Sequence, residues 1–118
     1  MSETKEMAEI KTLTEKDYQF LIELETLLYE RKEEMPKGSY TTSMYKKGLD
    51  KIAQKVGEEA VETVIASKNN KNKETINEAA DLLFHLMLLL AEKEIPLHKV
   101  VKKLRKRHNK GDHKHIGE

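Results

Sequence analysis

The sequence predicts an all-α protein, a helical bundle of about four to five helices. Two observations carry this prediction. Prolines and glycines are sparse, two and five in 118 residues, and no alternation of polar and apolar residues runs long enough for a strand. A chain of this length suits one domain. Because apolar residues make up only 37% of the chain, the core must be small, and pairing of two copies would help to stabilise it.

The first predicted helix begins after Thr14 and runs to about Glu34. The Thr14 hydroxyl can cap the helix, and acidic residues follow in the first turn, where the helix dipole favours negative charge. Pro36 ends the helix, because proline disfavours helical geometry in the residue before it. Helical spacing places these side chains on the inner side: Phe20, Leu24, Leu27 and Leu28, with Tyr29 at the edge.

Four further helices are expected along the chain. A short helix over 40–48 ends near a glycine, and a longer one covers 49–67. The connection 68–73 contains only lysine and asparagine, and asparagine favours turns. Another helix covers about 74–93. The last one covers about 96–108 and ends in basic residues, as the helix dipole favours.

The helix over 49–67 carries three glutamates, Glu58, Glu59 and Glu62, within five positions. On a helical wheel they lie off the main apolar face, on the same side as two lysines. Lys55 can pair with Glu59 four residues on, which would make an ordinary charged surface. This helix alone therefore does not distinguish a surface from a site.

The helix over 74–93 changes that balance. Leucine, phenylalanine and methionine cover nearly its whole circumference, which predicts a buried helix. Its polar residues nevertheless fall in one narrow arc, and no lysine or arginine occurs between 74 and 92 to neutralise them: Glu74, Glu78, Asp81, His85 and Glu92. A buried carboxylate is normally paired, protonated or bound to metal. Alternatively the arc is a thin solvent-facing seam, or lysines of the preceding helix neutralise it.

A short connection makes consecutive helices antiparallel neighbours, so residues equidistant from the turn lie side by side. Glu62 and Glu78 are equidistant from residue 70, in the middle of the connection, and so are Glu59 and Asp81. Four carboxylates at one height repel one another unless a cation lies among them. Ligands that are all oxygen favour Mg²⁺, with Mn²⁺ as the alternative, over zinc.

Groups that could bind phosphate precede these acids. Lys51 and Lys55 are point charges within two turns of them, and "YTTS" at 40–43 supplies hydroxyl and backbone donors near a helix start. His85, on the acidic arc, either hydrogen-bonds a ligand carboxylate or is an ordinary satisfied core histidine. The chain has no glycine-rich P-loop.

The residues "SYTTSMYKKGLDKIAQKVGEEAVETVIA" and "NEAADLLFHLMLLLA", with a helix ending "RKRH", resemble the phosphoribosyl-ATP pyrophosphohydrolases. "EEAVE" and "EAAD" also fit the EExxE…ExxD signature of the wider MazG-like, all-α nucleotide pyrophosphohydrolases. The resemblance covers 18–108. It leaves 1–17 as an N-terminal extension and 109–118 as a flexible tail.

The resemblance implies Mg²⁺-dependent hydrolysis of phosphoribosyl-ATP to phosphoribosyl-AMP and pyrophosphate, the second step of histidine biosynthesis, by a homodimer. It implies that four carboxylates hold the metal: Glu59, Glu62, Glu78 and Asp81. Glu58 would then orient or deprotonate the attacking water, or bind a second ion. The phosphate-binding residues would be Lys51, Lys55, Ser39, Tyr40 and Thr41. Members of the family fused to a second domain bind zinc there through cysteines, so a chain without cysteine is expected to be the stand-alone form.

Two other functions stay open at this point. The same chemistry could act on a canonical or damaged nucleoside triphosphate, or the chain could be a helical dimerisation or nucleic-acid-binding module. From residue 99 on there are eight lysines and arginines against two acids. No aromatic residue is interleaved with them, which makes nucleic-acid binding an unfavoured alternative. The absence of cysteine, the polar N-terminus and the short apolar runs predict a cytoplasmic protein without a membrane segment.

Overall fold

The computed structural model describes residues 10–109, and within them it is all-α, as predicted. Five helices follow one another, joined by short connections, and no strand occurs in the described residues. Most of the predicted extension (1–17) and nearly all of the predicted tail (109–118) lie outside the described residues. The helices are α2 (Glu15–Glu34), α3 (Tyr40–Lys47), α4 (Leu49–Ser67), α5 (Asn72–Glu92) and α6 (Leu97–Asn109).

The predicted cap of α2 is formed by Thr14 and Asp17 together. The Thr14 hydroxyl accepts a hydrogen bond from the Asp17 backbone N–H, and the Thr14 N–H donates to the Asp17 carboxylate at 2.9 Å. Such a reciprocal pair satisfies two backbone donors at the start of a helix. At the other end, Met35 adopts a left-handed conformation (φ 50°) before Pro36, and its N–H donates to the Arg31 carbonyl. Both ends of α2 are therefore fixed locally.

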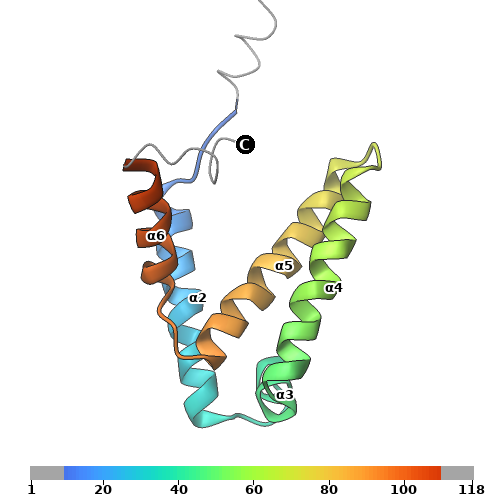
Figure 1. The fold of residues 1–118 in the computed structure, drawn as a ribbon. Coiled ribbons are helices and arrows are strands. Elements are labelled where there is room, and N and C mark those ends of the chain that lie inside the picture. The colour runs from blue at the N-terminus through green and yellow to red at the C-terminus, as the bar shows by residue number, and fades with distance from the viewer. Residues whose placement is uncertain (1–9, 110–118) are drawn as a thin grey trace, which may run out of the picture.

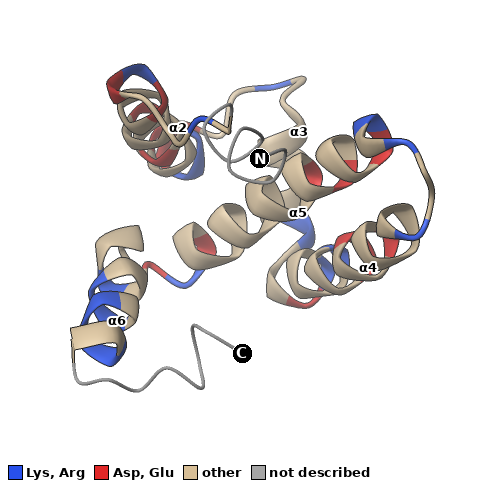
Figure 2. Ribbon diagram, turned by 90° about the horizontal axis from the view of Figure 1, so that it is seen from above, with Lys and Arg blue, Asp and Glu red and all other residues tan. Residues whose placement is uncertain are grey.

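The helices form an open V (Figure 1). One arm is the antiparallel hairpin of α4 and α5, the most extensive helix pair in the molecule, and the other contains α2 and α6. Viewed from above, α2 and α6 lie apart from each other (Figure 2). The core occupies the closed end of the V, where α2, α3, α4 and α5 meet. Its buried members are Leu28, Met44, Tyr45, Ile52, Met87, Leu88 and Ala91.

Two side chains of α2 bind the ends of neighbouring helices, one on α5 and one on α6. The Lys32 ammonium donates to the last carbonyls of α5, at 2.7 Å to Glu92 and 3.4 Å to Ala91. Seven residues, or about two helical turns, before Lys32, the Glu25 carboxylate accepts a hydrogen bond from the Leu97 N–H at the start of α6, at 2.7 Å. Helix ends leave backbone groups without intrahelical partners, and a charge of the right sign stabilises each end.

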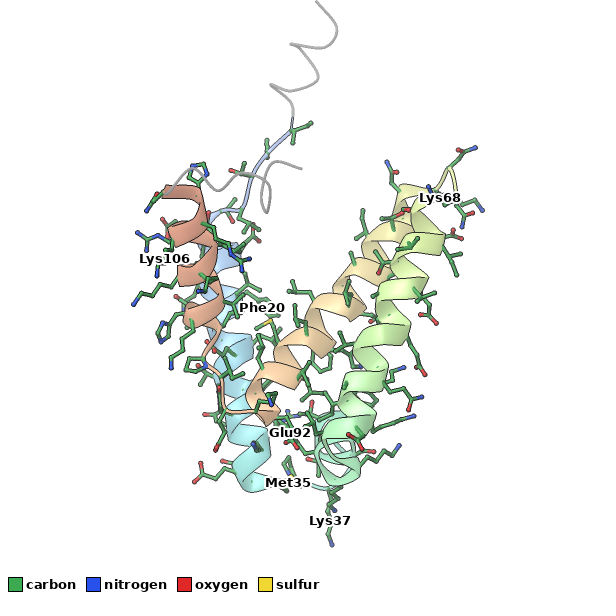
Figure 3. The ribbon with its side chains drawn as sticks, viewed as in Figure 1. Phe20, Met35, Lys37, Lys68, Glu92 and Lys106 are labelled. Carbon is green, nitrogen blue, oxygen red and sulfur yellow. The ribbon has the colours of Figure 1, made fainter. Side chains whose placement is uncertain are left out.

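Some apolar residues predicted to be inside are exposed in the single chain. Leu28 is buried and Leu24 partly buried, but Phe20 is 59% and Leu27 38% exposed. The prediction that α5 is buried all round is likewise wrong for one chain, since Leu83 is 47% exposed. The reason is the open V, because the arms diverge away from the core and leave these faces without a covering helix. Figure 3 shows Phe20 on the side of α2 that faces α5.

None of the helices in the described part of the chain combines the length and hydrophobicity needed to cross a membrane.

Candidate active site

The α4–α5 hairpin brings three of the predicted metal ligands together. One carboxylate oxygen from each of Glu59, Glu78 and Asp81 lies within 4.8 Å of the others. The short connection 68–71 makes the two helices antiparallel, so acids equidistant from the turn meet side by side. Figure 2 shows acidic residues on both helices of the hairpin.

Glu59 is more deeply placed than the helical wheel suggests. Its exposure is only 5%, and it lies in line with Ile52 and Ala66, the other buried residues of α4, at intervals of seven. The prediction that all three glutamates of α4 lie off the buried face is therefore wrong for Glu59. The apolar arc of α4 does not predict burial correctly, because packing against α5 determines which face of α4 is covered. Part of the arc, including Val64 at 60% exposure, faces away from α5.

Glu62 approaches the group from the next turn of α4. Its carboxyl shares a hydrogen bond with that of Glu78, and this contact, with the repulsion between the two charges, raises the pKa of Glu62. Proximity to a like charge disfavours ionisation. The structure thus places Glu62 beside Glu78, although it does not lie among the three oxygens that are mutually closest.

The carboxylates are incompletely neutralised by the described residues. Glu59 Oε2 and Glu78 Oε2 are buried and have no hydrogen-bond partner among those residues. Lys55 Nζ lies 3.3 Å from Glu59 Oε1 and 3.5 Å from Glu58 Oε1, and a single ammonium cannot balance four acids. Buried oxygens without a donor and a cluster of like charges both favour a bound cation. The all-oxygen donor set fits Mg²⁺ or Mn²⁺.

Glu58 lies outside the group of three, on the exposed side of α4. Gln54 Nε2 donates to its carboxylate at 2.7 Å. This hydrogen bond, and the charges of Lys55 and Lys51, keep the pKa of Glu58 below its usual range. Glu58 is therefore an ionised acceptor at neutral pH, and its catalytic role stays a prediction.

Tyr40 and His85 form a hydrogen-bonded pair next to the acids. His85 is buried; its Nδ1 lies 2.7 Å from the backbone carbonyl of Asp81, and its Nε2 lies 2.8 Å from the Tyr40 hydroxyl. Since a carbonyl only accepts, Nδ1 carries the proton, and a neutral ring then accepts from Tyr40 through Nε2. Of the two alternatives for His85, the structure favours the satisfied core histidine, because the buried ring bonds to the backbone of Asp81 and to Tyr40.

The Tyr40 ring is the point where α3 meets α5. It packs against Phe84 (6.4 Å between ring centroids) and edge-on against His85 (5.8 Å). Burial raises its pKa, and the charges of Lys55 and Glu59 also act on it, so the hydroxyl lies within the field of the acidic group. Sequence reasoning missed this pairing, because nothing in the local pattern links residue 40 to residue 85.

A shallow concavity of about 620 Å³ runs along α3. It includes two of the three residues predicted to bind phosphate in this segment, Ser39 and Tyr40, whereas Thr41 is buried and does not line it. The Ser39 hydroxyl accepts from the Thr42 N–H and from Arg31 Nη1, at 3.3 and 3.0 Å. The full lining is Lys37, Gly38, Ser39, Tyr40, Thr42, Ser43, Lys46 and Lys47.

An all-helical hairpin that brings carboxylates together beside a lysine is suited to a hydrolase that holds a divalent cation against a phosphate chain. The family model described as phosphoribosyl-ATP pyrophosphohydrolase matches residues 21–108. The chain therefore belongs to the phosphoribosyl-ATP pyrophosphohydrolase family and is a hydrolase. The family predicted from the sequence is confirmed.

Two kinds of relatives are similar to this chain. It is 52% identical over 91 residues to a phosphoribosyl-ATP pyrophosphatase of Leptospira biflexa, covering 77% of this chain and 99% of that one. It is 55% identical over 80 residues to the Listeria welshimeri protein of the same name, covering 68% and 77%. A histidine biosynthesis bifunctional protein of Bacillus subtilis is 53% identical over 87 residues, covering 74% of this chain but only 42% of that protein. The chain thus spans nearly all of the first relative and less than half of the bifunctional one.

Proposed function

We propose that this chain hydrolyses the α–β phosphoanhydride of phosphoribosyl-ATP in a Mg²⁺-dependent reaction, releasing phosphoribosyl-AMP and pyrophosphate. The names of its relatives support the substrate and the place of the step in histidine biosynthesis. The metal dependence is inferred from the group formed by Glu59, Glu78 and Asp81. In this group one buried oxygen each of Glu59 and Glu78 has no hydrogen-bond partner among the described residues.

The metal would be held by Glu59, Glu78 and Asp81, with Glu62 completing the set from the next turn. A bound divalent ion would shield phosphate charge and lower the pKa of a coordinated water. Glu59 is fixed for this role by its burial and by Lys55. With four carboxylates in place, Mg²⁺ is the first candidate and Mn²⁺ the second.

The remaining predicted residues would supply a base and groups that bind phosphate. Glu58 is ionised and exposed, so it can accept a proton from a water on the open side of α4. Lys55 already contacts Glu58 and Glu59, and its ammonium can bind a phosphate oxygen when the metal takes over Glu59. Lys51 acts from one turn earlier, where its charge reaches Glu58. Ser39 and Tyr40 supply hydroxyl groups for phosphate at the start of α3, in the concavity along that helix.

The assembly that fits this function is a homodimer. The single chain exposes large apolar side chains on both arms of the V, on helix faces that no other described helix covers. Burying one such side chain stabilises an association by about 1.5–3 kcal/mol. Examples are Phe20, Ile22, Ile76, Leu83, Val101 and Leu104. A cytoplasmic location agrees with a biosynthetic step and with the absence of cysteine.

The deciding experiment measures pyrophosphate release from phosphoribosyl-ATP by the purified chain, with Mg²⁺, with Mn²⁺ and with a chelator. We expect turnover that stops in chelator and returns when Mg²⁺ is added. A panel of deoxynucleoside triphosphates tests the alternative that the chain is a general nucleotide pyrophosphohydrolase. Faster hydrolysis of any of these than of phosphoribosyl-ATP would overturn the proposed substrate, and turnover that persists in chelator would overturn the metal.

A further inference from the structure

The concavity along α3 consists of hydrogen-bond donors and positive charge. Residues 39, 43 and 46 recur at helical spacing and so share one face of the helix. Lys37 joins them from the preceding turn, and Figure 3 shows it at the closed end of the V. No acidic residue lines the concavity among those the structure describes. Its volume of about 620 Å³ lies within the usual range for small-molecule sites.

Two hydroxyl groups of the concavity, those of Ser39 and Thr42, can still donate a hydrogen bond to a ligand. Ser39 accepts two hydrogen bonds, from Thr42 N–H and from Arg31, which leaves its own O–H to donate outward. Thr42 also lines the concavity; it is only 3% exposed, and its hydroxyl has no partner among the described residues. Buried hydroxyls are normally satisfied. A ligand rich in acceptors and carrying negative charge matches these donors, and phosphate is such a ligand.

Tyr40 joins this concavity to the acidic group. Its half-exposed ring lines the concavity, whereas its hydroxyl is bonded to His85, which is itself anchored on the Asp81 carbonyl. A ligand lying across Tyr40 would therefore extend from the carboxylates to the lysines of α3. The two ends of such a ligand would lie in different surroundings. One end would meet carboxylates, which suit a metal-bound phosphate, and the other would meet lysines.

We propose that the concavity binds the phosphate of the substrate's phosphoribosyl group, and so distinguishes phosphoribosyl nucleotides from nucleotides that lack it. This inference rests on the proposed function, which supplies a substrate with phosphates at two ends. Lys55 and the metal ligands serve the phosphate chain that is cleaved. Lys37, Lys46 and Lys47, together with the Ser39 and Thr42 hydroxyls, serve the other phosphate.

The test compares binding of two ligands that share the nucleotide 5′-phosphate, phosphoribosyl-AMP and AMP, by calorimetry in Mg²⁺. The variant is Lys46→Gln/Lys47→Gln, which removes two charges on exposed side chains. The matched control is Lys102→Gln/Lys106→Gln, which removes two lysines from a smaller basic concavity on α6. We expect the wild type to prefer phosphoribosyl-AMP by about tenfold or more, the effect of one charged hydrogen bond.

The α3 variant should lose most of that preference while its affinity for AMP is unchanged, and the α6 control should keep it. Lys37→Gln provides a second, independent variant at the other end of the concavity, with the same expected loss. Equal weakening for both ligands would mean that the concavity binds the shared phosphate, and would overturn the proposal. So would a preference that survives both α3 variants, or one that disappears only in the α6 control.

The proposal and the proposed function fail in different ways. If the wild type releases no pyrophosphate from phosphoribosyl-ATP, the function is wrong whatever the binding shows. If turnover is normal but the lysine variants bind both ligands as the wild type does, the function stands and the phosphate site is wrong.

Discussion

The two arms of the V differ in which of their groups have no partner within the described chain. The α4–α5 hairpin buries its contact face and concentrates its unsatisfied groups, the carboxylates, at one height between the helices. The arm with α2 and α6 has little core of its own: it exposes Phe20 and Ile22 on α2, and Val101 and Leu104 on α6. The hairpin also exposes apolar side chains such as Ile76 and Leu83, but among the described residues only the hairpin gathers carboxylates that a cation would neutralise. Both arms therefore have faces suited to assembly, whereas the groups suited to chemistry lie on one of them.

The largest effect is expected where the hairpin's acids converge. Asp81→Asn and Glu62→Gln should each lower Mg²⁺-dependent turnover by about 10²–10³-fold, because each removes a charge that would hold the metal. The fold should survive or gain stability without metal, since like-charge repulsion is relieved. Turnover and thermal unfolding with and without Mg²⁺ are the measurements. The control is Glu23→Gln, which changes an exposed acid on α2. Full activity of both site variants would show that the hairpin does not hold the metal.

The second prediction addresses the other arm. Phe20→Asp should convert the proposed dimer into a monomer, because it replaces an exposed apolar side chain, which a second copy would cover, by a charged one that is costly to bury. Sedimentation velocity at micromolar concentration measures this, and Phe20→Tyr, which keeps the ring, is the control. A wild-type chain that sediments as a monomer would show that the exposed faces have another use.

The third prediction tests the link between α3 and the hairpin. Tyr40→Phe and His85→Phe should each lower turnover by roughly tenfold, the value of one buried hydrogen bond, with metal affinity unchanged. If His85 acts through Tyr40, the double variant should be no worse than the poorer single one, because both remove the same interaction. Additive losses would show that His85 acts independently, and His85→Gln, which keeps an acceptor, should restore part of the activity.

The smallest effect is expected at the start of α2. The Thr14 backbone N–H and hydroxyl lower the pKa of Asp17 from its usual value of 3.8. Ionised Asp17 therefore stabilises the folded chain at pH above about 4, and this contribution is lost as the pH falls through the lower folded-state pKa. Asp17→Asn should reduce stability at neutral pH and match the wild type in strong acid. Chemical unfolding at several pH values measures the difference, and a gap that does not change with pH would contradict it.

Local patterns in the sequence predicted the helices and the meeting of the acids. The Thr14 cap and the break at Pro36 are signals within a few residues, and helix α2 has the predicted bounds. The distance of each acid from residue 70 predicted which carboxylates of α4 and α5 lie close. Burial was harder to predict, because it depends on where the arms diverge: Phe20 and Leu83 are exposed although their patterns are apolar. The Tyr40–His85 bond joins residues 45 apart, and helical periodicity carries no information over that distance.

The two contacts that α2 makes with the ends of α5 and α6 also favour the direction in which α2 docks. Glu25 meets the beginning of α6, and Lys32 meets the end of α5. The two ends of a helix have opposite electrical polarity. If α2 were turned end for end, its carboxylate would face carbonyls and its ammonium would face N–H groups, so both contacts would become repulsive. A charge swap, Glu25→Lys with Lys32→Glu, would therefore penalise the native orientation twice. Two charged residues of α2, seven positions apart, thus favour one orientation of this helix against the ends of α5 and α6.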